Sequence, residues 1–170
     1  MKTVVRRISF GLLLSANLCT ASFAQSPPAS TARSFLSEAG VLNRVNKLCG
    51  RPLSSEVSRT LGDFLLAASV NPRMDGAAAS DEQLLTGIRQ PSAERLESVR
   101  REIEIYNQVV GLVTTRHEVE GAASVCSTEF QARANVFVKN ARADGTAAQA
   151  KRIADLMVRN RCAALGCRAA

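Results

Sequence analysis

The sequence predicts an all-α, single-domain helical bundle of five or six helices, cross-linked by two disulfides. Apolar residues recur three and four positions apart over most of the 170-residue chain, and no stretch shows the two-residue alternation of a strand. Glycine and proline interrupt these stretches at short intervals, which favours short loops and antiparallel neighbouring helices. An even number of cysteines remains once a predicted export signal is removed.

The start of the chain carries the three-part pattern of a secretory signal peptide. Three basic residues among the first seven precede an apolar run from Ile8 to Leu18, and small residues follow up to Ala24. The run is too short to cross a bilayer, which needs about 20 apolar residues. We therefore expect residues 1–24 to be removed by cleavage between Ala24 and Gln25, and the mature protein to be periplasmic or secreted.

The mature chain is expected to begin with a short leader and to continue as one helical domain. Residues 25–31 contain two adjacent prolines and small polar residues, which predicts a flexible segment before a domain over residues 32–168. The first helix is expected from about Ala32 to Cys49, because a glycine and a proline follow its apolar repeat.

The next two helices have equally clear boundaries. The second begins at Ser54 or Ser55 and is closed by Asn71-Pro72, since the residue before a proline disfavours helical backbone. A short third helix is expected over 81–89, where three apolar residues share one side and a proline follows.

The fourth helix has the clearest pattern, because its apolar residues repeat alternately three and four positions apart. Such a seam keeps one stripe facing a neighbouring helix. We interpret it as part of an intramolecular core, with a coiled-coil dimer as the alternative. The seam consists of Leu96, Val99, Ile103, Tyr106, Val110 and Val113.

Two further helices complete the predicted bundle. Ser127 is a suitable cap for the fifth helix, which ends at Asp144-Gly145. Thr146 and Gln149 have the spacing of a capping box, so we expect them to start the sixth helix.

Four cysteines remain in the mature chain, namely Cys49, Cys126, Cys162 and Cys167. An even number in an exported protein predicts two disulfides, and the absence of close pairs with a nearby histidine argues against zinc. On one continuous helix the Cα atoms of Cys162 and Cys167 would lie about 8–9 Å apart, too far for a disulfide. We therefore expect each of them to reach Cys49 or Cys126, with a local bridge after Gly166 as the alternative.

Charge is distributed unevenly along the mature chain, which has 19 basic and 15 acidic residues. Residues 133–170 carry a net charge of +6, whereas residues 25–132 carry −2. This asymmetry favours a protein partner or an anionic surface, with an ordinary solvated surface as the alternative. Few aromatic residues accompany the basic ones, which argues against nucleic acid. The candidate basic binding surface comprises Arg142, Lys151, Arg152, Arg159 and Arg161.

No arrangement of catalytic residues stands out in the sequence. His117, the single histidine, lies close to Glu118 and Glu120, but two or three such residues do not complete a metal site or a catalytic group. No nucleophile elbow, phosphate-binding loop, dinucleotide fingerprint or haem-attachment motif is present. We expect no metal, no cofactor and no catalytic residue, although an envelope hydrolase using Glu118 or Glu120 stays an alternative.

These observations favour an exported, disulfide-stabilised helical binding protein that acts by protein–protein interaction. It would serve as an inhibitor, an immunity-type protein or an accessory protein of an envelope or secretion complex, with a partner in the cell envelope or outside. No transmembrane segment is expected after signal cleavage. The alternative is a periplasmic carrier of a small apolar ligand, in which Tyr106, His117 and Met157 would face the ligand.

Overall fold

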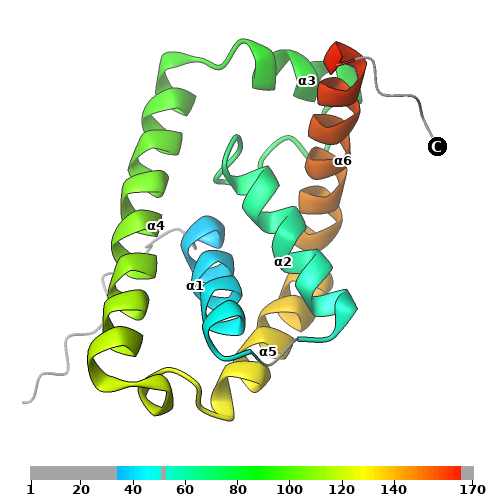
Figure 1. Cartoon of the computed structure of the whole chain (residues 1–170). Coiled ribbons are helices and arrows are strands. Elements are labelled where there is room, and N and C mark those ends of the chain that lie inside the picture. Colours follow the sequence, from blue (N-terminus) through cyan, green and yellow to red (C-terminus); the bar gives the residue numbers. More distant parts are fainter. Residues whose placement is uncertain (1–33, 51–52, 166–170) are drawn as a thin grey trace, which may run out of the picture. The chain divides into compact units, whose positions relative to one another are not determined.

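The computed structural model describes residues 34–50 and 53–165, without the side chains of Ala163 and Leu165. This part of the chain is all-α, as predicted, with six α-helices, one short 3-10 helix and no strand. The predicted signal peptide and leader lie outside the described residues. The elements are α1 (Phe35–Leu48), α2 (Ser55–Ala68), α3 (Asp81–Arg89), α4 (Ala93–Glu120), η1 (Ala122–Ser124), α5 (Glu129–Ala143) and α6 (Thr146–Leu165) (Figure 1).

A serine side chain caps the start of each of the first four helices. In each case the hydroxyl accepts a hydrogen bond from the backbone N–H three residues later, and Ser80 also forms a capping box with Gln83. Such a cap satisfies a backbone N–H that would otherwise lack a partner and contributes about 1 kcal/mol. The four caps are Ser34, Ser54, Ser80 and Ser92.

These caps account for where the helices begin. The predicted starts of the second and third helices are confirmed. The first helix begins at Phe35 rather than at Ala32, because the Ser34 hydroxyl caps it there. The expected cap at Ser127 is wrong, since Thr128 precedes α5 and no side chain caps that helix.

The capping box predicted for the sixth helix is also wrong. The Thr146 hydroxyl donates to a carboxylate oxygen of Asp144 at 2.6 Å, and the Gln149 side-chain amide donates to the carbonyl of Asp75 at 3.2 Å. Gly145 has a φ of +80°, which lets the chain turn and begin α6 directly at Thr146. Gln149 therefore connects α6 to the loop before α3 and does not cap its own helix.

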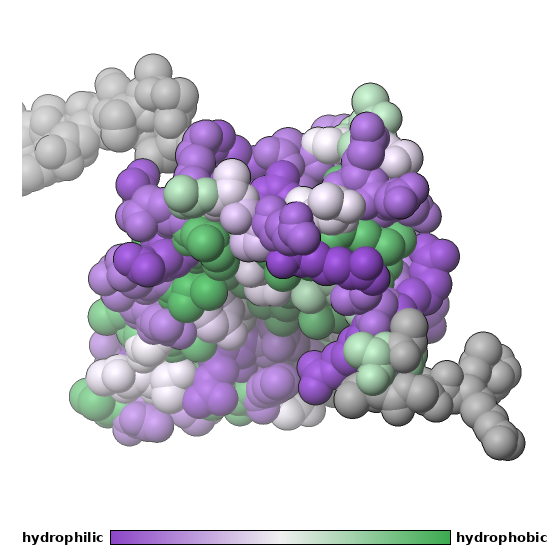
Figure 2. Space-filling model, turned by 90° about the horizontal axis from the view of Figure 1, so that it is seen from above, coloured by the Kyte–Doolittle hydropathy of each residue, from purple (hydrophilic) through white to green (hydrophobic). Residues whose placement is uncertain are grey.

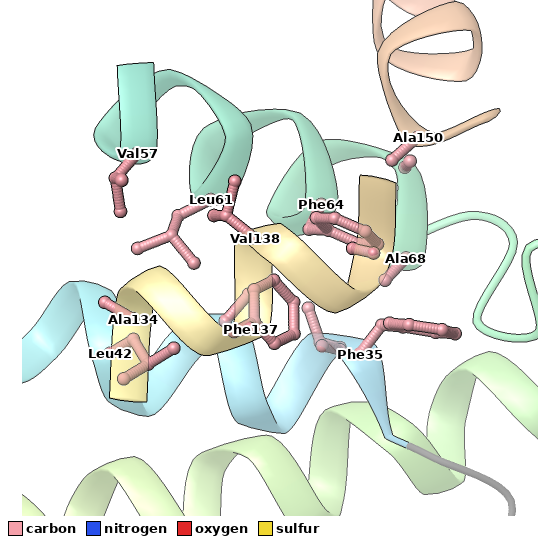
Figure 3. Close-up of a cluster of buried hydrophobic side chains, with 14 of the residues drawn as sticks. Phe35, Leu42, Val57, Leu61, Phe64, Ala68, Ala134, Phe137, Val138 and Ala150 are labelled. Atoms are coloured by element: carbon pink, nitrogen blue, oxygen red, sulfur yellow. The ribbon is translucent and has the colours of Figure 1, made fainter. Parts of the chain in front are cut away.

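The hydrophobic core lies between α1, α2, α5 and α6, with Phe64 at its centre (Figure 3). The Phe64 ring is stacked on Phe35 with centroids 5.2 Å apart and meets Phe137 edge-on at 5.0 Å. Leu61 and Ile153 are, like Phe64, almost completely buried. Burying a large apolar side chain of this kind contributes about 1.5–3 kcal/mol. The three rings, together with Leu61 and Ile153, therefore supply a large part of the stability of the fold.

Small residues allow α2 and α6 to pack closely. Ala67 and Ala68 on α2 and Ala150 and Ala154 on α6 are all buried. Figure 1 shows α2 alongside α6, with α1 on the other side of α2. Around this core the surface seen in Figure 2 is mostly hydrophilic, with separate hydrophobic patches.

α4 lies alongside α1 at the edge of the helical domain (Figure 1). None of its 28 residues is buried. Tyr106 and Val113 pack against the core as predicted for the seam, whereas Leu96 and Ile103 stay exposed. The seam is therefore only partly a core stripe, because α1, with 14 residues, is half as long as α4 and cannot cover it.

Among the described residues, a disulfide joins Cys49 to Cys126 with the Cα atoms 5.5 Å apart. α1 and α4 run parallel, as the contacts of successive α1 residues with successive α4 residues show. Their carboxyl ends therefore meet, and this brings Cys49 close to the segment after η1. The expectation that Cys162 and Cys167 reach these two cysteines is wrong. Cys162 lies half-buried on α6, and Cys167 is outside the described residues.

Candidate functional site

The predicted basic surface lies on the last turn of α5 and along α6, where most of its residues contact acidic groups. The Arg152 Nε donates to Asp81 at 2.8 Å, and one of its terminal nitrogens donates to the carbonyl of Ala79 at 2.7 Å. Arg159 lies 3.8 Å from the other oxygen of Asp81. These contacts fasten α6 to the first residue of α3.

The other basic residues of this surface are distributed differently. Arg142 pairs with Glu56 of α2 at 2.6 Å, and Lys151 pairs with Asp155 of its own helix at 2.6 Å. Arg161 is exposed near the end of α6. Because acidic partners from α2 and α3 face α5 and α6, the charge asymmetry counted along the sequence is smaller in the folded chain.

Asp63 of α2 lies beside this surface, close to Lys151 and Asp155. Burial raises the pKa of the Asp63 carboxyl above its ordinary value. Lys151 and Arg59 oppose this effect, whereas the negative charge of Asp155 adds to it. Folding therefore disfavours the charged form of Asp63, because desolvation outweighs the attraction of the two cations.

The residues considered for acid–base chemistry lie at the end of α4. The Glu120 carboxylate accepts a hydrogen bond from the Arg116 Nε at 2.9 Å, one helical turn earlier. Glu118 is exposed, and the His117 carbonyl accepts from the Gly121 N–H at 3.0 Å. Glu120 thus forms an ordinary helix-stabilising ion pair. Among the described residues, no group of three or more His, Cys, Asp or Glu could hold a metal ion.

Tyr106, one of the residues considered for an apolar carrier, lines a groove between α1 and α4. Neither His117 nor Met157 is among the described residues that line this groove. Met157 packs against the hydrophobic core from α6. The groove is also lined by charged and polar side chains, which suits a polar ligand better than an apolar one.

The most distinctive apolar feature of the surface is on α4. Of the eight large apolar residues that are exposed in the described part of the chain, five belong to this helix. Ile105, Leu112 and Val119 are 38%, 69% and 78% exposed. They recur seven residues apart and therefore lie along one line of the helix, which we call the outer stripe. Leu96 and Ile103, also seven residues apart, lie along a different line.

Polar side chains border the outer stripe. Three or four residues away from its members are Arg101, Gln108, Thr115 and Arg116, and all four are exposed. Sequence reasoning missed the outer stripe, because the seam on the opposite flank explained the periodicity of this helix. The signal that could have revealed it is the second seven-residue repeat of apolar residues.

The described helices include none that is long and apolar enough to span a membrane. The arrangement on α4, an apolar line within a polar border, has the composition of a surface that contacts another molecule. Comparison with protein-family models, with curated proteins and with solved structures finds no match to this chain.

Proposed function

We propose that this protein is an exported, disulfide-stabilised helical binding protein that acts by protein–protein interaction through the outer stripe of α4. The observation that carries the proposal is the exposure of Ile105, Leu112 and Val119 on a helix without a single buried residue. Exposed apolar residues that gather on one element, bordered by polar ones, are typical of interaction surfaces.

The spacing of the outer stripe favours an amphipathic helix as the docking element of the partner. Apolar residues seven positions apart match the repeat of two helices that pack nearly parallel to each other. Arg101 and Arg116 at the border favour acidic residues on the flanks of the partner helix. Burying the three exposed side chains would contribute about 3–5 kcal/mol, before the cost of association is subtracted.

Export and the second disulfide belong to the same proposal. The Cys49–Cys126 bond is consistent with an oxidising compartment. The predicted signal peptide would direct the chain to such a compartment. Because Cys49 and Cys126 are bonded to each other, the second predicted disulfide is assigned to Cys162 and Cys167. Arg142, Arg152 and Arg159 have structural roles in this proposal, since each pairs with an acidic residue of a neighbouring helix.

The test compares two leucine substitutions in the mature, oxidised protein. Leu112→Ser removes the central member of the outer stripe, and Leu66→Ser removes a leucine that is 44% exposed on α2. The tagged proteins are incubated with extract of the native envelope, and the proteins recovered with each are quantified by mass spectrometry.

We expect wild type and Leu66→Ser to recover the same partner, and Leu112→Ser to recover at least about tenfold less, since tenfold corresponds to about 1.4 kcal/mol. Equal recovery by both variants would remove the outer stripe from the proposal. Sedimentation equilibrium of the same proteins shows whether the outer stripe binds a second copy of this chain or a different protein. A dimer that Leu112→Ser dissociates would identify the occupant of the stripe as a second copy of this chain.

A further inference from the structure

A groove of about 470 Å³ lies between α1 and α4, and its lining contains none of the three outer-stripe residues. Its volume is within the range of small-molecule sites, about 300–1,000 Å³. α1 contributes Asn43, Arg44 and Lys47 to its lining, and α4 contributes Asn107 and Thr115. The groove thus combines two cations with amide and hydroxyl groups, and none of the described residues that line it is acidic.

The Thr114 side chain of α4 holds Arg44 of α1 in place. The Arg44 Nε donates to the Thr114 Oγ1 at 2.9 Å, and the Thr114 hydroxyl in turn donates to the Val110 carbonyl at 2.8 Å. The two terminal nitrogens of the guanidinium have no hydrogen-bond partner among the described residues. They form a planar pair of donors, the geometry that suits a carboxylate or a phosphate. Within the described part of the chain, neither Arg44 nor Lys47 has an ion-pair partner.

An aromatic ring forms another part of the groove. Tyr106 lies directly against Gly40, where a Cβ atom would be only 2.2 Å from the Tyr106 Cε2. Gly40 therefore allows α1 and α4 to approach each other with the ring between them. A ring with an apolar body and a polar hydroxyl suits a ligand that has both an apolar face and hydroxyl groups.

We propose that this groove binds an anionic sugar. The carboxylate or phosphate group of the sugar lies against Arg44 and Lys47, because these cations have no acidic partner among the described residues. The hydroxyl groups of the sugar bond to Asn43 and Asn107, and its ring packs against Tyr106. This site is independent of the protein-binding role, because the outer stripe contributes none of these residues.

The experiment is a titration of the mature, oxidised protein, followed through its backbone amide resonances. The probes are glucuronate, glucose 6-phosphate, glucose and inorganic phosphate, all at low ionic strength. The two charged sugars are expected to shift the amides of residues 40–47 and 106–115. We expect glucose and phosphate to bind at least about tenfold more weakly than the charged sugars, because each offers only one of the two kinds of contact.

Two variants connect the binding to Arg44. Arg44→Met is expected to weaken both charged sugars about tenfold or more, and Thr114→Val, which keeps the charge but removes the oxygen that holds Arg44, about threefold. Arg133→Met, on an exposed arginine of α5, is the matched control and should bind as wild type does. Unchanged amide spectra outside the groove verify that the variants are folded.

Three results would overturn the proposal. They are the absence of shifts in the groove at millimolar sugar, unchanged affinity in Arg44→Met, and phosphate binding as tightly as glucose 6-phosphate. Leu112→Ser separates this site from the protein-binding role, since it should bind the sugars normally whatever its effect on partner recovery.

Discussion

Replacing Cys49 and Cys126 together by serine measures what the disulfide contributes to the stability of the domain. The bond closes a loop of 77 residues. In the chain-entropy model, a loop of that length removes about 15 cal/mol/K from the entropy of the unfolded chain, or about 4.5 kcal/mol at 25 °C. Domains of this size have a net free energy of unfolding of about 5–15 kcal/mol, so the expected loss is a large share of the total.

The assay is equilibrium unfolding in urea of the mature protein, followed by circular dichroism. The free energy of unfolding of the double variant should be lower by about 4 kcal/mol. Its slope against urea concentration should steepen, because the unfolded chain without the disulfide exposes more surface. Replacing Cys162 and Cys167 by serine is the matched control. Their separation of five residues would close only a short loop, so the proposed second disulfide should contribute no more than about 2 kcal/mol.

A loss below about 1 kcal/mol in the Cys49/Cys126 variant, with an unchanged slope of unfolding free energy against urea concentration, would show that the disulfide does not stabilise the domain by restricting the unfolded chain. Such a result would mean that the unfolded chain gains little freedom when the bond is absent. Reversal of the order, with the larger loss in the control variant, would contradict the assignment of the second disulfide to the two C-terminal cysteines.

Three further substitutions test contacts within the domain, each by urea unfolding. Gly40→Ala should lower the free energy of unfolding by about 1–3 kcal/mol, because its Cβ would clash with Tyr106. Burial raises the pKa of Asp63, so this group contributes stability below its unfolded pKa that is lost as pH rises through its folded pKa. The difference in free energy of unfolding between Asp63→Asn and wild type should therefore favour the variant more at pH 7 than at pH 3. Arg152→Met should cost about 1–2 kcal/mol, because it loses its contacts with Asp81 and the loop before α3.

Gly40→Ala and Arg152→Met each have a matched control. Gly111→Ala places a Cβ in open space on α4 and should stabilise the helix by up to about 1 kcal/mol. Arg161→Met changes an exposed arginine and should stay within about 0.5 kcal/mol of wild type. Equal changes in stability in Gly40→Ala and Gly111→Ala would contradict the predicted clash with Tyr106. Equal changes in Arg152→Met and Arg161→Met would contradict a stabilising role for the Arg152 contacts. A stability difference between Asp63→Asn and wild type that does not change with pH would contradict the sign derived for Asp63.

The helices themselves could be predicted because their signals are local. A helix start is marked by a serine whose side chain caps the backbone N–H three residues later. A helix end is marked by a glycine or proline after the last apolar residue. Both signals involve only residues that are close in the sequence. Ser80 and Gln83 form the capping box that Thr146 and Gln149 only resemble. The second pair differs because Gln149 finds a partner in the loop before α3, which is distant in the sequence.

The disulfide partner and the surface of α4 could not be predicted because both depend on how the helices pack. Cys49 meets Cys126 because α1 and α4 run parallel, a relation between helices that are not consecutive. The seam of α4 predicts which residues are able to pack, but the length of α1 decides which of them do. The outer stripe becomes visible as a candidate site only once α1 is seen to occupy the other side of α4.

Export and both disulfides can be tested together by the mass of the protein purified from its native source, combined with peptide mapping under non-reducing conditions. We expect a chain that begins at Gln25, with no free thiol and with peptides linked between Cys49 and Cys126 and between Cys162 and Cys167. A chain that still begins at Met1, or four free thiols, would contradict this expectation.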